Sequence, residues 1–243
     1  MNFIEKDLFL GSIQELVKLI NMNTLNNSKR CYFAINPDCM LTYWSDDTYK
    51  AILNSKNALV YVDGYGVIYA QKLLGLKVAS ERIATTDLFP ELMGYLNEKK
   101  SNLRVYLLGG NDDTAARVKE RFSLEFPDVK IVGTHHGYFE DGEAIVNEIN
   151  KLNTDILFVG FGTPLQEKWV KENYIHLQTN TIITCGGLFD YYSGNVKRAP
   201  ALLRKMGFEW LYRLVQEPRR LYKRYIFGNL KYISKIFKMK MNL

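Results

Sequence analysis

The sequence predicts an α/β protein built on a mostly parallel sheet with helices on both faces, followed by a basic helical appendage. Two observations predict the sheet. Short apolar runs rich in Ile, Val, Leu and Tyr alternate with segments of helical period, and each run leads towards Gly, Asn, Asp or Pro. Strands separated by helices are typical of parallel sheets. A third observation predicts the appendage, because the alternation stops near Gly194 and basic helices follow.

The expected elements follow one another in a regular order. Each expected strand is a short run of β-branched, aromatic and other apolar side chains, which suit a buried pleated surface. The expected strands are residues 31–36, 58–62, 104–108, 130–134, 155–160 and 181–185. The expected helices are residues 12–24, 43–54, 65–75, 86–99, 112–124, 141–151 and 164–177.

Composition limits the class of protein. With 243 residues, of which 47% are hydrophobic and 24% charged, the chain can bury a full core. No run approaches the roughly 20 apolar residues that span a bilayer, and the N-terminus does not read as a signal peptide. Cys31, Cys39 and Cys185 have no paired spacing, so we expect a reduced cytoplasmic protein without disulfides or a thiolate metal site.

Glycine and polar residues follow the expected strands. The carboxyl ends of parallel strands share one edge of the sheet, where ligands collect. Glycines there let backbone N–H groups approach a phosphate, and helix N-termini favour negative charge. The pattern is typical of a nucleotide-binding rim, and ordinary turn chemistry is the alternative. The segments are residues 36–38, 63–66, 109–112, 133–137, 160–167 and 186–190.

Asp63 is the most prominent carboxylate of this edge. It directly follows the apolar run 58–62 and precedes Gly64. A carboxylate in that place can accept a proton from an attacking hydroxyl. It can equally cap the helix that follows, and the residues alone favour neither role. Asp190 presents the same two alternatives.

Several catalytic motifs are absent from the sequence. No G-x-G-x-x-G follows the first expected strand, and neither Walker A nor G-x-S-x-G occurs, which disfavours dinucleotide, P-loop and serine-hydrolase chemistry. There is no D-x-D motif, and for the lone pair His135-His136 a turn or polar contact is favoured over a metal. We therefore expect neither a metal nor a cofactor.

Positive charge is concentrated near the C-terminus. Between Lys197 and Lys240 thirteen Lys and Arg face two acids, a balance of +11, whereas the whole chain carries +6. This asymmetry predicts a polyanionic partner: nucleic acid, an anionic lipid surface or a phosphorylated ligand.

A helix over residues 219–240 would be amphipathic. Its apolar stripe has Lys and Arg beside or opposite it, which is typical of a helix at a membrane interface. A solvated helix that packs this stripe on the domain is the alternative. The stripe consists of Leu221, Tyr225, Ile226, Leu230, Ile233 and Phe237.

Four motifs, in order and at matching spacing, resemble those of a known family. They are D-G-x-G at residues 63–66, GFGTPLQEKW at 160–169, GGLFDYYSGNVKRAP at 186–200 and FEWLYRLVQEPRRLYKRY at 208–225. Together they closely resemble the WecG/TagA/CpsF family of bacterial glycosyltransferases. The resemblance covers nearly the whole chain. It implies a Rossmann-like α/β catalytic domain over residues 1–194 and a basic helical appendage over residues 195–243, which meets the membrane and helps close the site.

The resemblance also implies a reaction. Members typically transfer N-acetylmannosamine from its UDP form onto undecaprenyl-diphosphate-linked N-acetylglucosamine, with inversion, in the synthesis of wall teichoic acid, enterobacterial common antigen or capsule. The expected partners are therefore a UDP-sugar donor and a polyprenyl-diphosphate-linked sugar acceptor. A third is the inner membrane surface, which the cytoplasmic enzyme contacts peripherally. Apolar surface on an open appendage would also favour a homo-oligomer.

The motifs assign roles to individual residues. Asp63 is the expected general base that deprotonates the acceptor hydroxyl. Arg213, Arg220 and Arg224 would hold the UDP diphosphate as negative charge grows on it, since guanidinium groups fork onto phosphate oxygens and stay charged. The expected substrate-binding residues are Asn36, Gly64, Gly109, Gly110, Gln166, Glu167, Asp190 and Arg198.

Three departures from the family pattern lie in regions that can select the sugar. Ala34 stands where many members have Thr, residues 82–87 lack a Gly that is often found there, and Phe161 stands where Leu is usual. Glucose, mannose or a uronic acid is therefore an alternative donor sugar.

Two other classes of protein are weaker alternatives. A nucleic-acid-binding protein would explain the basic segment, but no RNP, zinc-finger or helix-turn-helix signature accompanies the charge. A nucleotide-sugar epimerase or dehydrogenase would need the missing G-x-G-x-x-G. We therefore expect no nucleic-acid partner.

Overall fold

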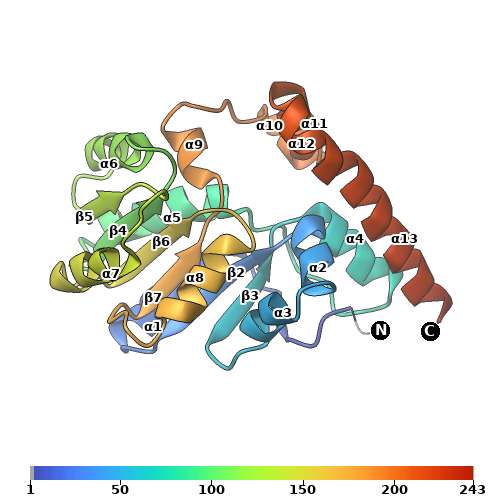
Figure 1. Cartoon of the computed structure of the whole chain (residues 1–243), viewed down its shortest axis with the longest axis horizontal. Helices are drawn as coiled ribbons and strands as arrows, with labels where there is room; N and C mark the ends of the chain where they lie inside the picture. Colours follow the sequence, from blue (N-terminus) through green and yellow to red (C-terminus); the bar gives the residue numbers. More distant parts are fainter. Residues whose placement is uncertain (1–2, 243) are drawn as a thin grey trace.

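The computed structural model describes residues 3–242, which form one seven-stranded sheet and the helices around it (Figure 1). Its strands are β1 (Leu8–Phe9), β2 (Arg30–Ile35), β3 (Ala58–Val62), β4 (Arg104–Gly109), β5 (Lys130–His135), β6 (Ile156–Gly160) and β7 (Thr181–Thr184). They lie in the order β1-β3-β2-β7-β6-β4-β5, and every neighbouring pair is parallel. The predicted parallel α/β fold is confirmed.

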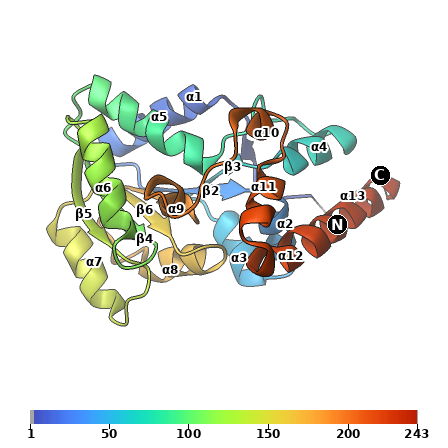
Figure 2. The same ribbon diagram turned by 90° about the horizontal axis from the view of Figure 1, so that it is seen from above.

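Helices cover both faces of the sheet (Figure 2). One face packs against α1 (Ile13–Leu25), α5 (Thr85–Glu98), α6 (Thr114–Glu125) and α9 (Leu188–Tyr192). The other packs against α2 (Pro37–Tyr43), α3 (Asp47–Leu53), α7 (Gly142–Lys151) and α8 (Leu165–Asn173). Helix α4 (Tyr65–Leu73) buries Val67, Ile68 and Ala70 in the core of this second face.

Each central strand contributes to both cores. In β2, Phe33 and Ile35 face one core and Tyr32 faces the other; in β3, Val60 and Tyr61 divide in the same way. Successive strand residues point to opposite faces, so a sheet covered on both sides needs apolar residues at every position. The strands therefore read as continuous apolar runs in the sequence.

Two local differences from the predicted elements have clear causes. The edge strand β1 spans two residues, which is too short to show a periodic pattern. The helix predicted over 43–54 is present only over α3, because a separate helix, α2, ends at Tyr43 and each of the two has its own cap. The Asn36 side chain accepts from the backbone N–H groups of Asp38 and Cys39, and the Asp46 side chain accepts from that of Tyr49. Each cap starts a new helix.

The chain after Gly194 forms helices beyond the edge of the sheet (Figure 1). They are α10 (Ala201–Lys205), α11 (Glu209–Gln216), α12 (Pro218–Tyr222), a π-helical turn (Lys223–Phe227) and α13 (Gly228–Met241). The helix predicted over 219–240 is therefore present but is interrupted by the π-helical turn. Among the described helices, none combines the length and the apolar character needed to cross a membrane.

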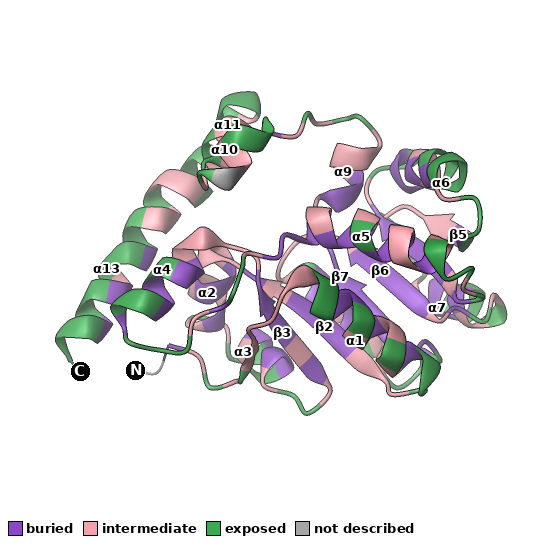
Figure 3. Cartoon of the chain, turned by 180° about the vertical axis from the view of Figure 1, so that it is seen from behind, coloured by how far each residue is buried: buried purple, intermediate pink, exposed green. Residues whose placement is uncertain are grey.

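The predicted apolar stripe of the last helices is divided between two environments. Leu221 is buried, whereas Ile233 and Phe237 are 48% and 55% exposed. Helix α13 instead packs on the domain through the neighbouring residues Tyr232 and Ile236, which are buried. The alternative in which the whole stripe packs on the domain is therefore wrong. Figure 3 shows the resulting mixture of buried and exposed positions along α13.

Candidate active site

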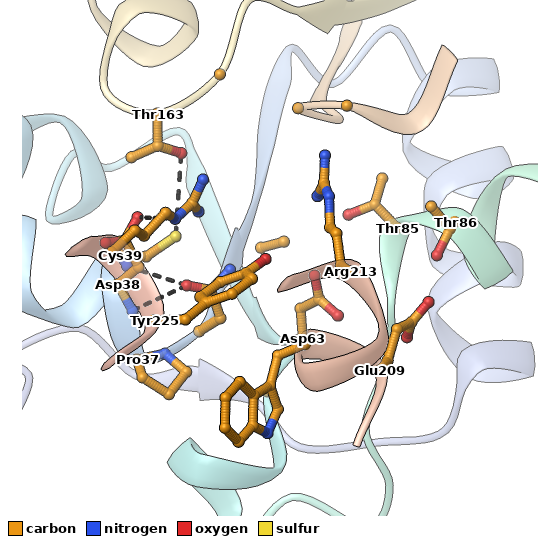
Figure 4. A pocket seen from close by; sticks show the side chains of 18 of the residues that line it. Pro37, Asp38, Cys39, Asp63, Thr85, Thr86, Thr163, Glu209, Arg213 and Tyr225 are labelled. Carbon is orange, nitrogen blue, oxygen red and sulfur yellow. Dashed lines mark hydrogen bonds and ion pairs between the residues drawn. The ribbon is translucent and has the colours of Figure 1, made fainter. Parts of the chain in front are cut away.

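A cavity of about 1650 Å³ lies at the carboxyl ends of the strands. The loops after β2, β3, β4, β6 and β7 form one side, and helices α11 to α13 with the π-helical turn form the other. Figure 4 shows part of this lining at close range. Pockets for a single small ligand measure about 300–1,000 Å³, so this cavity is large enough for two substrates.

Strand β3 delivers Asp63 to the wall of the cavity. The backbone N–H of Asp63 donates to the carbonyl of Ile35 over 2.9 Å, which extends the β2–β3 pairing by one residue. Helix α4 begins two residues later, at Tyr65, with Gly64 as its N-cap and no side-chain cap. The capping alternative for Asp63 is therefore wrong, and its carboxyl group is available to a ligand.

The environment of Asp63 favours its neutral form more than water does. The side chain is 24% exposed. Burial raises its pKa to about 7; the Arg82 guanidinium opposes this shift, and the carboxylates of Glu209 and Asp87 add to it. A carboxyl group that titrates near neutral pH can both accept and release a proton under physiological conditions.

Arg82 connects Asp63 to the C-terminal helices. Its Nε atom lies 3.4 Å from Oδ1 of Asp63 and donates to the Asp63 carbonyl over 2.8 Å. Its Nη2 atom lies 2.7 Å from Oε2 of Glu209 in α11. No sequence pattern assigned a site role to Arg82, because its importance depends on a contact between residues 127 positions apart. The one feature of the sequence that could have indicated Arg82 is its position directly before the apolar residues Ile83 and Ala84.

Arg198 holds the C-terminal segment to the domain. Its Nη2 atom lies 2.7 Å from Oδ1 of Asp87 in α5, and its Nε atom lies 3.4 Å from Oε1 of Glu209. Arg198 was expected to bind substrate, but it does not line the cavity. Its charge is already engaged by two carboxylates, so it acts as a tether in this structure.

Arg213 reaches the loop after β7. Its guanidinium carbon lies 5.3 Å from the centre of the Tyr191 ring, and its side chain is 18% exposed. A Cβ atom on Gly187 would lie 2.9 Å from Nη2 of Arg213, so any larger residue there would displace the guanidinium. In Figure 4 Arg213, Asp63 and Glu209 all line the cavity.

All three predicted arginines line the same cavity beside acidic partners, and the Nε atom of Arg213 lies 3.6 Å from Oε1 of Glu217. The Nε atom of Arg220 lies 2.5 Å from Oε2 of Glu217, and the Nε atom of Arg224 lies 2.9 Å from Oδ2 of Asp38. The structure therefore brings all three arginines to the cavity that contains Asp63. The sequence motif indicated the arginines, and Asp38 lies in the segment 36–38 that was predicted at the sheet edge, but its pairing with Arg224 was not predicted.

The predicted substrate-binding residues divide into two groups. Asn36, Gly64, Gly110, Gln166 and Asp190 line the cavity. Gly109 and Glu167 do not line it and lie behind this first layer. Gly109 has φ 145°, and a Cβ atom on it would lie 2.5 Å from the carbonyl oxygen of Gly160, so its role is to let two strand ends approach closely.

Gln166 and Glu167 form a buried pair below the loop after β6. The Oε1 atom of Gln166 accepts from the N–H groups of Gly162 and Gly186 over 3.2 and 2.9 Å, which joins the β6 and β7 loops. Glu167 is 1% exposed and accepts from the Gln166 amide and the Thr163 hydroxyl. Burial raises its pKa. Glu167 therefore supports the loop in this structure and does not line the cavity.

Three further observations concern the histidine pair, Arg117 and the possibility of a metal site. The Nδ1 atom of His136 accepts from the N–H of Tyr138 over 3.1 Å, which is the turn contact expected there. Arg117, which had no predicted role, lines the cavity and donates to Asn195 over 2.6 Å. Within residues 3–242 no three His, Cys, Asp or Glu side chains are grouped as metal ligands.

Comparison with known proteins places the chain in a family. The model of the glycosyl transferase WecG/TagA/CpsF family matches residues 1–243. The chain belongs to this family. As a WecG/TagA/CpsF protein it is a glycosyltransferase, which confirms the prediction from the four motifs and decides against the nucleic-acid-binding and epimerase alternatives.

Two WecG/TagA/CpsF relatives carry the same name, N-acetylglucosaminyldiphosphoundecaprenol N-acetyl-beta-D-mannosaminyltransferase. The protein of Bacillus subtilis is 38% identical over 187 residues, which cover 76% of this chain and 71% of the relative. The protein of Bacillus spizizenii is 31% identical over 240 residues, which cover 98% of this chain and 89% of the relative.

The four WecG/TagA/CpsF motifs surround the same cavity. They contribute Asp63 from the first, Gln166 from the second, Gly187 and Asp190 from the third and Arg213 from the fourth. Segments more than a hundred residues apart in sequence thus combine an acid, a buried amide and guanidinium groups. This set can accept a proton and bind phosphate at one site.

Proposed function

We propose that this protein is an inverting glycosyltransferase that moves N-acetylmannosamine from a UDP-sugar to undecaprenyl-diphosphate-linked N-acetylglucosamine. The observation that carries the proposal is that Asp63 and the three arginines line one cavity. The names of the two Bacillus relatives support the transferred sugar and the acceptor. The UDP donor rests on the resemblance to the family and on the phosphate-binding character of the arginines.

In the proposed reaction Asp63 acts as general base. Its carboxylate takes the proton from the acceptor hydroxyl while the hydroxyl oxygen attacks the anomeric carbon of the donor. The new glycosidic C–O bond forms on the face opposite the departing UDP, and the bond from the anomeric carbon to the phosphate oxygen breaks with its electron pair on UDP. The pKa of about 7 leaves a large fraction of Asp63 ionised at neutral pH.

The arginines stabilise the departing diphosphate. Negative charge grows on the phosphate oxygens as the bond breaks, and fixed guanidinium groups in a partly enclosed cavity stabilise that charge. Arg213 lies beside the glycine loop after β7, whose residues Gly186 and Gly187 also line the cavity. Arg220 and Arg224 lie on the side from which α13 begins, and we assign them to the diphosphates of donor and acceptor.

The C-terminal helices also bring the site to a membrane in this proposal. Lys231, Lys235 and Lys238 lie on α13 and can approach anionic headgroups, each contributing about 1 kcal/mol. Peripheral contact with the inner face of the cell membrane would give the enzyme access to a lipid-linked acceptor. Association into a homo-oligomer stays a prediction.

A different donor sugar is the second candidate. Ala34, Thr85, Thr86 and Phe161, which belong to the three departures from the family pattern, all line the cavity. Residues that line the site can select the sugar, so glucose, mannose or a uronic acid carried on UDP is the alternative to N-acetylmannosamine.

A transfer assay tests the proposal and its alternative together. The purified protein is given a lipid-diphosphate N-acetylglucosamine acceptor and a panel of UDP-sugars, and the products are read by mass. We expect one added N-acetylhexosamine from UDP-N-acetylmannosamine. Addition of a hexose or uronic acid from another UDP-sugar would support the second candidate, and the absence of any transfer would contradict both.

A further inference from the structure

The cavity continues from the polar site into an apolar groove between α4 and α13. Tyr69 and Leu73 line it from α4, and Ile233 and Phe237 line it from α13. All four are exposed. Along the described lengths of these two helices, no Asp, Glu, Lys or Arg contributes to the lining. We call this part of the cavity the α4–α13 groove.

Packing of the adjacent residues of α13 keeps the groove in place. Tyr232 stacks on Trp44 with ring centres 5.7 Å apart, and its hydroxyl donates to the carbonyl of Gly66 over 3.2 Å. Ile236 and Met239 are also buried. Helix α13 is thus fixed by one face while Ile233 and Phe237 stay uncovered. Apolar side chains gathered in this way on a protein surface indicate a binding site.

The chemistry changes in a definite order along the cavity. Asp63 lies at the sheet edge, Arg220 and Arg224 precede α13, and the apolar lining follows on α13. From Arg224 to Phe237 the helical chain advances about 20 Å. An acceptor with a sugar, a diphosphate and an isoprenoid chain presents the same order: a hydroxyl for the carboxylate, phosphates for the guanidinium groups and then a hydrocarbon.

We infer that the α4–α13 groove binds the first isoprene units of the acceptor's polyprenyl chain, adjacent to its diphosphate. The inference rests on the proposed function, since it takes the acceptor from there. A groove with an apolar wall on each of two helices suits a single linear hydrocarbon. It suits the flat face of a bilayer less well, because the wall on α4 would then be left out of contact.

The test uses a paired substitution in the groove and a control on the same helix. The test variant is Ile233→Ser with Phe237→Ser. The control is Met241→Ser, which removes an exposed apolar side chain of α13 that does not line the cavity. All three side chains are largely exposed, so we expect both variants to fold, and their thermal unfolding is compared with that of the wild type.

Binding is measured first, without vesicles or detergent. Calorimetry compares geranylgeranyl diphosphate, below its micelle concentration, with inorganic diphosphate. We expect the wild type to bind the isoprenoid compound at least about tenfold more tightly, since the chain buries apolar surface. The paired variant should lose most of this preference, and Met241→Ser should keep it. Equal affinity of the wild type for the two compounds would overturn the inference.

Kinetics give the second measurement and separate the inference from the proposed function. Lipid-diphosphate N-acetylglucosamine acceptors with a short alkyl chain and with an isoprenoid chain are compared. The paired variant should raise KM about tenfold for the isoprenoid acceptor only. Tight isoprenoid binding without any sugar transfer would support the inference about the groove and contradict the proposed function. Transfer without any chain preference, or variants that weaken only vesicle binding, would overturn the groove.

Discussion

The Nη2 atom of Arg82 lies 2.7 Å from the Oε2 atom of Glu209, although 127 positions separate the two residues in the chain. Both side chains are less than 20% exposed. The same guanidinium contacts Asp63. The C-terminal helices therefore take part in the electrostatic environment of the carboxyl group that we propose as the base.

Replacement of this base should stop the chemistry and spare donor binding. We expect Asp63→Asn to lower turnover by about 10²–10⁴-fold, since general-base assistance contributes that much. The amide keeps the shape of the side chain, so the affinity for the UDP-sugar, measured by calorimetry, should persist. Asp190→Asn is the matched variant, because Asp190 is another carboxylate of the lining. A large loss in that variant with full turnover in Asp63→Asn would make Asp190 the base.

The pH dependence follows from the raised pKa of Asp63. The base must be ionised, so kcat/KM should rise with pH through about 7. Asp63 in the folded state keeps its proton up to a pH of about 7, whereas the same carboxyl group in the unfolded chain, with a pKa near 3.8, loses its proton at lower pH. Stability should therefore fall as pH rises between these values. Urea unfolding across this range should show a fall in the wild type that is smaller in Asp63→Asn.

Glu209→Gln tests the link between the C-terminal helices and the base. The Glu209 carboxylate helps raise the pKa of Asp63, so its loss should lower that pKa. We expect the acid limb of kcat/KM to move to lower pH by on the order of one unit or less. Glu98→Gln, on the exposed surface next to Lys99, is the control and should leave the profile unchanged. An unmoved limb in Glu209→Gln would show that Glu209 serves only to hold the helices in place.

A chain that ends at residue 194 lacks the three arginines of the cavity. We expect this fragment to lose at least about 10²-fold in turnover, because stabilisation of the departing group is a major part of catalysis. Its binding to anionic liposomes should also weaken. Circular dichroism must show that the fragment is folded, since removal of α13 uncovers Trp44. Normal transfer by a folded fragment would mean that the C-terminal helices are not part of the site.

Chelation should have little effect on the reaction. The sequence lacks a D-x-D motif, and three arginines line the cavity in which we propose that the diphosphate binds. We expect EDTA to change turnover by less than about twofold. Removal of a main electrostatic group, in contrast, typically lowers turnover by about 10²-fold or more. Strong inhibition that magnesium or manganese restores would show that a divalent ion assists the leaving group.

The sheet and the position of Asp63 could be predicted because both depend on local sequence. A buried strand is a continuous apolar run, and a carboxylate directly after such a run must lie at the sheet edge. The contacts of Arg82 and Arg198 could not be predicted in this way, because they join the domain to a segment more than a hundred residues further along the chain. Glu167 was misplaced for a related reason. The motif predicts that Glu167 lies near the site. Only the packing of α8 decides that Gln166 faces the cavity and that Glu167 faces the core.

The stacking of Tyr232 on Trp44 has a consequence for biosynthesis. The ribosome makes Asp63 before the residues of the C-terminal helices, so a nascent chain carries the acid well before it carries Arg213 or α13. Docking of α13 against α2 can occur only after this late segment has left the exit tunnel. Under the proposed function, we therefore expect a chain that lacks α13 to be unable to use a nucleotide-sugar.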